Sequence, residues 1–283
     1  MPSPSVSPSG ALRAFSYQGL FVASRVLGQL SNACAYLAAG MCTRGELAAS
    51  LRAQFDAFDH EPDYAQSGLT PFEGRLVDRW LPKRGLALVL GCGPGRELVA
   101  LIRRGYGVVG VEQAPDAAAR ARANLSALGL AGVVETARLE HVEAAGPFLI
   151  VLFSDSCYSN VQGAEHRIAS LRRVVSRMEP DARMLLFYQA ATTRSRAALG
   201  LMRLGARLAG GAWYPEPGDC VTPGPGGALF FTHTFVNGEV ATECEAAGLH
   251  VLGEETSGRL RCVVARLASA DDQPESRATE AVA

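Results

Sequence analysis

A glycine-rich loop, Gly91-Cys92-Gly93-Pro94-Gly95, joins an apolar run at 86–90 to a helical stretch that begins at Glu97. Glycines let the backbone turn sharply and approach a ligand closely, and free N–H groups at a helix N-terminus favour an anionic or polar group. A dinucleotide loop requires a further glycine where this chain has Arg96. The loop therefore predicts a ligand site, and the missing glycine argues against a nicotinamide-dependent oxidoreductase.

An acidic residue, Glu112, ends the next apolar run, 107–111. A carboxylate at this place can accept both hydrogen bonds from a ribose diol. The loop and the acid together predict a nucleoside site, in which we interpret Cys92 as a packing residue and not as a nucleophile.

Candidate substrate and catalytic residues follow later in the chain. Ser154, Asp155, Ser156, Cys157 and Tyr158 come directly after the apolar run 148–153, where open α/β sheets bind ligands. His233 and Asp219 are candidates for a general base and a carboxylate, and Trp213 and Tyr214 for an aromatic wall, although a packed loop explains these four equally well. His141, His166 and His250 are interpreted as structural or solvated.

The elements that must position these residues alternate between short apolar runs and helical stretches, which is typical of a parallel α/β sheet. Strands are expected at 86–90, 107–111, 132–137, 148–153 and 183–188, and a helix after 168 is expected to stop at Pro180. A helix at 238–247 and a hairpin at 250–267 close the domain. The segment 190–235 breaks this rhythm and is expected to form a cap.

The remaining segments divide the chain further. Residues 1–10 and 268–283 are expected to be disordered tails, since they offer little to bury. Residues 11–84 form a helical lid segment, broken near Gly40 and Gly45, and 85–267 form the main domain. The lid includes 64–73, and Tyr64 is a candidate substrate contact.

Composition excludes several classes of protein. Of 283 residues, 48% are hydrophobic and 19% charged, with a net charge of -1, so the basic footprint of a nucleic-acid-binding protein is absent. The 7 cysteines never form a CxxC pair, which argues against a disulfide framework and a zinc site. Polar residues interrupt the apolar stretch 19–41, so we expect no membrane span, no metal and a cytoplasmic location.

The sequence resembles the class I S-adenosylmethionine-dependent methyltransferases. The matching segments are 88–95 (LVLGCGPG), 108–112 (VVGVE), 178–186 (MEPDARMLL) and 246–251 (AAGLHV). The resemblance implies a Rossmann-like seven-stranded sheet of order 3-2-1-4-5-7-6 with strand seven antiparallel. It also implies that S-adenosylmethionine binds at Gly91, Cys92, Gly93, Gly95, Glu112, Gln113, Leu139, Ser154 and Asp155.

Two positions depart from the family pattern. The acid that the family often carries before the glycine loop is Val89 here, so Glu97 or Asp155 becomes a candidate for the amino group of the cofactor. The acid that commonly meets the adenine is replaced around Arg138.

The function expected from these features is O- or N-methylation of a small molecule, with secondary metabolism as the setting. The alternative is a cofactor-binding protein of the same fold without methyl transfer. The sequence identifies neither the acceptor, nor the methylated atom, nor the oligomeric state.

Overall fold

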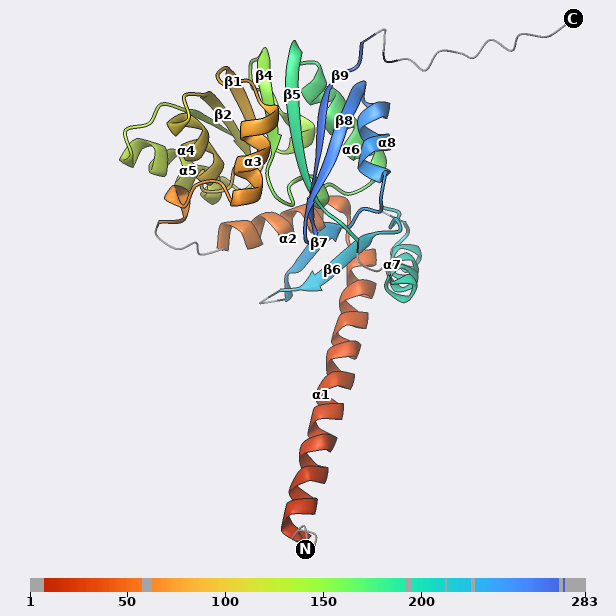
Figure 1. Ribbon diagram of the computed structural model, residues 1–283. Helices are drawn as coiled ribbons and strands as arrows, with labels where there is room; N and C mark the ends of the chain where they lie inside the picture. Colours follow the sequence, from red (N-terminus) through yellow and green to blue (C-terminus); the bar gives the residue numbers. More distant parts are fainter. Residues whose placement is uncertain are drawn as a thin grey trace, which may run out of the picture.

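The protein is built on a seven-stranded sheet with helices on both faces (Figure 1). The structure is a computed structural model that describes residues 8–57, 63–191, 195–211, 213–224, 227–269 and 272, with side chains from residue 17 onward. Of the expected tails 1–10 and 268–283, residues 1–7, 270–271 and 273–283 lie outside the described part. Residues 8–10 are helical, and Asp272 accepts hydrogen bonds from Arg266 at 2.7 and 2.6 Å.

The strand order is β3-β2-β1-β4-β5-β9-β8, and β9 runs antiparallel to both of its neighbours. Strands β6 and β7 form a separate hairpin, so β8 and β9 are the sixth and seventh strands of the main sheet. The observed order therefore confirms the predicted order 3-2-1-4-5-7-6. The sheet strands are β1 (Leu86–Leu90), β2 (Gly107–Glu112), β3 (Val133–Thr136), β4 (Phe148–Phe153), β5 (Met178–Gln189), β8 (Leu249–Ser257) and β9 (Leu260–Leu267).

Helices cover the sheet in two layers, each with its own apolar core. One face packs against α3 (Pro71–Trp80), α4 (Arg96–Arg103) and α5 (Pro115–Ala127), the other against α6 (Ala164–Val175) and α8 (Glu239–Ala246). β1 and β4 are apolar on both faces because both layers bury them.

The helix before β5 ends earlier than the sequence predicts. α6 ends at Val175, and Pro180 lies inside β5 instead of stopping a helix. Between Phe148 and Ile150 the pairing of β4 with β5 shifts in register, so the strand passes Pro180 through an irregular stretch of the ladder.

The N-terminal segment consists of a long helix and a shorter one. α1 (Pro8–Met41) projects from the body of the molecule, and only its C-terminal part packs against it (Figure 1). α2 (Arg44–Ala57) and the short helix η1 (Tyr64–Gln66) follow. The break falls at residues 42 and 43, between the two predicted positions. Among the described residues, no helix has the length and apolar content needed to cross a membrane.

The segment expected to form a cap folds as α7 (Arg196–Leu208) and the hairpin of β6 (Asp219–Pro223) and β7 (Leu229–His233). Its small apolar core joins Trp213, Val221 and Phe231 to Ala39 and Leu47 of the N-terminal helices. The cap and the N-terminal helices therefore form one packed unit, which lies below the sheet in the view of Figure 1.

Candidate active site

A cavity of about 780 Å³ opens at the carboxyl ends of β1, β2 and β4. Open parallel sheets bind ligands at this edge, and the volume lies within the ~300–1,000 Å³ of small-molecule sites. Its walls come from the glycine loop, the ends of β2 and β4, the segment 137–141, α2 and β7.

The glycine loop adopts the left-handed backbone that its sequence predicts. Gly91, Gly93 and Gly95 have φ values of +70°, +50° and +99°. A Cβ on Gly91 would lie 2.6 Å from Cys157 Cβ, so this glycine is needed for packing, whereas a Cβ on Gly93 would meet no atom within 4 Å. The space beside Gly93 is part of a site in which a ligand can approach the backbone.

Glu112 holds the loop and faces the cavity. Its carboxylate accepts hydrogen bonds from Gly93 N and Ala114 N, both at 2.9 Å. Burial raises the pKa of Glu112, and the hydrogen bonds from backbone amides oppose this shift. Each carboxylate oxygen keeps a further lone pair for a ligand hydroxyl.

A buried ion network stands behind the loop. Arg96 donates two 2.7 Å hydrogen bonds to Glu73 and one of 2.6 Å to Glu97. One guanidinium thus serves two carboxylates, and burial raises the pKa of Glu97 to about 7 despite the attraction of Arg96. Because Glu97 lines the cavity, ionisation of both glutamates leaves one uncompensated negative charge at its wall.

The chain turns sharply after β4, at the opposite wall. Ser156 has φ +64°, the only positive value at a non-glycine residue in the described part of the chain. Asp155 accepts hydrogen bonds from Ser156 Oγ at 2.9 Å and Gln189 Nε2 at 2.7 Å. Ser154 Oγ is buried without a hydrogen-bond partner among the described residues, as expected for a group that completes its bonding with a ligand.

Helix α2 and the β6–β7 hairpin form one side of the cavity, which we call its roof. Ala48, Leu51 and Phe55 of α2 line it together with Phe230 of β7, and the Phe55 and Phe230 rings pack edge to face at 5.8 Å. Asp56 fixes the end of α2 by accepting hydrogen bonds from the N-terminal amides of α5, Asp116 N at 2.8 Å and Ala117 N at 3.3 Å. This contact supplies α5 with a cap, since its own N-cap residue is Ala114.

The structure brings most of the predicted cofactor residues to this one cavity. Its lining includes the predicted residues Gly91, Cys92, Gly93, Glu112, Gln113, Leu139, Ser154, Asp155 and Tyr64. Gly95 lies just behind the lining as the N-cap of α4. Burial raises the pKa of the Cys92 thiol well above its usual value, which fits a packing role.

The predicted aromatic wall is not part of the cavity lining. Trp213 is buried in the core of the cap, and its indole N–H donates to Ala39 O at 3.2 Å. Tyr214 is exposed and lies under the Arg203 guanidinium. Tyr158 is buried on the other side of β4 and donates a 2.6 Å hydrogen bond to Glu243. A substrate contact at these three positions has no support from the geometry.

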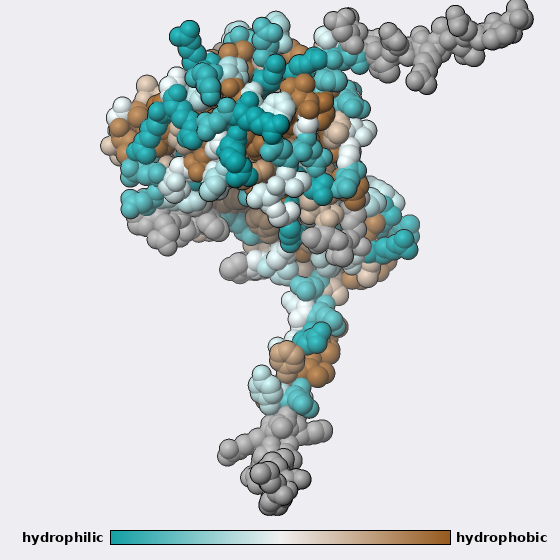
Figure 2. Space-filling view, in the orientation of Figure 1, coloured by the Kyte–Doolittle hydropathy of each residue, from teal (hydrophilic) through white to brown (hydrophobic). Residues whose placement is uncertain are grey.

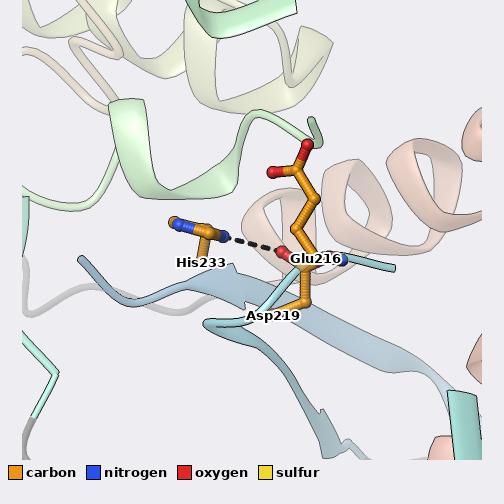
Figure 3. Close-up of side chains that lie close together, drawn as sticks. All are labelled: Glu216, Asp219 and His233. Atoms are coloured by element: carbon orange, nitrogen blue, oxygen red, sulfur yellow. Dashed lines mark hydrogen bonds and ion pairs between the residues drawn. The ribbon is translucent and has the colours of Figure 1, made fainter. Parts of the chain in front are cut away.

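His233 and Asp219 also lie outside the cavity lining. His233 is fully buried, and one ring nitrogen contacts Asp219 at 2.7 Å (Figure 3). Its other ring nitrogen contacts Glu239 at 3.1 Å. Burial alone lowers the pKa of His233, but the hydrogen bonds to the two carboxylates outweigh it and raise the pKa. A histidine held between two carboxylates has no free nitrogen, so the geometry favours a structural role over a general base.

Glu216 lies near Asp219 and His233, and the three side chains together are of the types that can bind a metal ion. Glu216, Asp219 and His233 each offer one ligand atom, all within 4.8 Å of one another. The carboxylate of Glu216 accepts hydrogen bonds from Ala164 N at 3.0 Å and Arg167 Nη2 at 3.3 Å. The hydrogen bonds of Glu216, Asp219 and His233 thus account for the three side chains lying close together.

Several cavity residues were not predicted as site residues. They are Arg44, Ala48, Leu51, Phe55, Glu140, His141, Asn160, Val161, Gln162, His166 and Phe230. Asn160 and Gln162 carry side-chain oxygens that are buried with no partner among the described residues. Their place shortly after β4, at the edge of the sheet where ligands bind, is the sequence signal that could have identified them.

An open α/β sheet with a glycine loop after β1 and a carboxylate at the end of β2 defines a Rossmann-like protein that binds a nucleoside-type ligand. Residues 87–178 match the family model of the methyltransferase domain. No curated protein matches the sequence.

Solved structures share the fold at low identity. The 1,6-didemethyltoxoflavin-N1-methyltransferase of Burkholderia thailandensis, solved with 1,6-didemethyltoxoflavin and S-adenosylhomocysteine, is 16% identical, with 81% of this chain and 92% of that chain covered and a TM-score of 0.56. The CcbJ methyltransferase of Streptomyces caelestis is 15% identical, with 77% and 96% covered and a TM-score of 0.55. For the mitomycin 7-O-methyltransferase MmcR the identity is 21%, the coverage 65% of this chain and 49% of that chain, about half its length, and the TM-score 0.46.

Residues 87–178 therefore match a methyltransferase domain, and most of the chain shares the fold of solved S-adenosylmethionine-dependent methyltransferases, so the cofactor that this domain implies is S-adenosylmethionine. The cavity fits this cofactor, since it offers open space beside Gly93, a carboxylate at Glu112 and an unpartnered hydroxyl at Ser154.

Proposed function

We propose that the protein methylates a small molecule that binds between the cofactor and the roof of the cavity. The observation that carries this proposal is the continuity of the cavity, which extends from Gly93 and Glu112 to Phe55 and Phe230. S-adenosylmethionine supplies an activated methyl group, and transfer requires that the acceptor be held in line with it while water is excluded. The roof residues perform these two tasks.

The shape and chemistry of the roof suggest the class of acceptor. The edge-to-face pair of Phe55 and Phe230 favours a flat apolar or aromatic body. Asn160 and Gln162 offer unpartnered polar atoms for an amine, amide or hydroxyl on that body. We therefore infer an aromatic or heterocyclic hydroxyl or amine, consistent with O- or N-methylation.

Glu97 is our candidate for the acid that Val89 fails to supply. It is buried at the cavity wall, and its network with Arg96 and Glu73 carries one excess negative charge when both glutamates ionise. The α-ammonium of the cofactor is a cation that this charge would attract. Asp155, the other candidate, has its Oδ1 engaged by Gln189 and Ser156.

Proton removal has candidates within the cavity. His141 and His166 line it, whereas His233 does not. If the acceptor is a hydroxyl or a protonated amine, we expect one of these two histidines to take the proton.

The proposed setting is secondary metabolism in the cytoplasm. Seven cysteines without a disulfide partner in the structure support a reducing compartment. One of the similar structures is by name a methyltransferase for a toxoflavin-type compound, which supports the choice of setting without identifying the acceptor.

The direct test incubates the protein with S-adenosylmethionine and a panel of aromatic hydroxyl and amine compounds, and measures S-adenosylhomocysteine formation. Acceptor-dependent turnover that falls in a Phe230→Ala variant supports the proposal. Tight cofactor binding without turnover on any compound would favour the alternative, a binding protein without methyl transfer.

A further inference from the structure

The projecting part of α1 carries an apolar surface that nothing in the described chain covers. Every residue from 17 to 32 is exposed, and this stretch alone is ~24 Å long at 1.5 Å per residue. Figure 2 shows apolar residues along this arm. Its exposed large apolar residues, between 48% and 72% accessible, are Tyr17, Leu20, Phe21, Val22, Val26, Leu27 and Leu30.

The spacing of these residues is that of a coiled coil. Leu20, Leu27, Cys34 and Met41 recur every seven residues, and Ala23, Leu30 and Leu37 each follow three residues later. This 3-4 spacing places them in one stripe along the helix, with the period at which two helices interdigitate. The stripe stays accessible beside the body, since Cys34 is exposed and Met41 is 49% accessible.

The larger polar residues lie on the opposite side of the helix, together with Val22, whereas Ser24 and Ser31 lie beside the stripe. Gln18, Arg25 and Asn32 also recur every seven residues, two positions before the residues of the stripe at 20, 27 and 34. Arg25 is the only charged residue from 17 to 41. Two copies can therefore pair along the stripe without bringing like charges together.

The C-terminal part of α1 packs closely against another helix, α7. Gly40 lies against the backbone of Met202, and Gly205 of α7 against that of Leu37, so closely that a Cβ on either glycine would overlap the other helix. The order of these contacts makes α1 and α7 antiparallel, and α7 ends at Leu208. Beyond that point α1 continues with the same mixture of small and large residues, and no helix of the described chain lies beside it.

We propose that α1 is a dimerisation arm, which pairs through the stripe Leu20, Ala23, Leu27 and Leu30 with the same helix of a second copy of this chain. A membrane surface fits less well, because helices that lie on membranes carry rows of Lys and Arg along their polar face, whereas the 34 residues of this helix include only Arg13 and Arg25. A second copy also supplies an identical heptad stripe, and symmetric dimers are the commonest oligomers.

The test is the mass of the full-length protein in solution, measured by light scattering and sedimentation velocity. We expect twice the monomer mass of 29.8 kDa. A variant with Leu20→Glu, Leu27→Glu and Leu30→Glu should be monomeric under the same conditions. A matched variant with Gln18→Glu, Gln29→Glu and Asn32→Asp adds the same charge to the polar side and should remain dimeric.

Two further measurements separate the proposal from a folding defect or another interface. The stripe variant should keep the melting temperature of its body and its affinity for S-adenosylhomocysteine, because residues 17–32 are exposed and outside the cavity lining. In the wild type, amide hydrogens of 17–32 should be protected from exchange and lose this protection on dilution.

A monomeric wild type, a stripe variant that stays dimeric, or unprotected amides in a dimer would overturn the proposal. If the wild type is monomeric and co-sediments with anionic phospholipid vesicles, the partner of the stripe is a membrane surface and not a second copy of the chain.

Discussion

Replacing Glu112 by alanine should weaken cofactor binding sharply while leaving the fold intact. The carboxylate lies at the cavity wall with one bond to Gly93 N and one to Ala114 N, and each oxygen retains a lone pair for the ribose diol. In the variant the ribose hydroxyls lose the carboxylate that accepts their hydrogen bonds. The Gly93 N–H, which donates to Glu112 in the wild type, is hydrated by water instead.

The expected magnitude follows from the charge on the acceptor. A hydrogen bond to a charged group contributes ~1.5–3 kcal/mol, so the dissociation constant should rise about 10- to 150-fold. The backbone bonds that Glu112 also loses exist with and without the cofactor, so they contribute to loop order more than to affinity.

Isothermal titration of S-adenosylmethionine and S-adenosylhomocysteine provides the assay. Glu135→Ala is the matched control, because Glu135 lies on the neighbouring strand β3, outside the cavity lining. An unchanged dissociation constant in a folded Glu112→Ala protein would refute the assignment of the ribose site.

Three further predictions concern the loop, the ion network and the cap. Gly93→Val should abolish cofactor binding with far-UV circular dichroism unchanged, since the side chain enters open cavity space at φ +50°; normal binding would make the loop a mere turn. Wild-type affinity for S-adenosylmethionine should rise as pH increases toward the Glu97 pKa of about 7, by up to about tenfold per unit, because the cation favours ionised Glu97. Glu97→Gln should bind more weakly and lose this slope, and a slope that persists would assign it to another group. His233→Ala should lower the free energy of unfolding by ~3–5 kcal/mol, since Asp219 loses its buried partner, while kcat of the folded enzyme stays near wild type. A loss of kcat with unchanged stability would restore His233 as a candidate base.

The raised pKa of His233 adds a pH dependence to the last variant. Folding favours the protonated ring, so its stabilisation is fully present below the ordinary pKa of 6.5 and is lost as pH rises through the raised value. The difference in melting temperature between wild type and His233→Ala should therefore shrink as the solution is made alkaline. A difference that stays constant with pH contradicts the paired imidazolium.

The cofactor half of the site was predictable because its determinants are local. The positive φ at Gly91, Gly93 and Gly95 follows from residue type, and Glu112 follows from its place at a strand end. The strand order was predicted from the resemblance to the class I methyltransferases, and the terminal hairpin read from the sequence agreed with its antiparallel strand.

The acceptor half depends on contacts between distant segments. Phe55 and Phe230 read as ordinary core residues until the hairpin packs on α2 and turns both rings toward the cavity. The sequence left a base and a packed residue equally open for His233, because its partners Asp219 and Glu239 become neighbours only through the pairing of β6 with β7 and the start of α8. Spacing along the chain carries no signal for either arrangement.

The most direct test of the central claim is a crystal structure with S-adenosylhomocysteine. The account predicts the ribose on Glu112, the amino group beside Glu97, and the sulfur directed toward the space under Phe55 and Phe230. A ligand bound elsewhere, or a sulfur that faces solvent away from that roof, would contradict it.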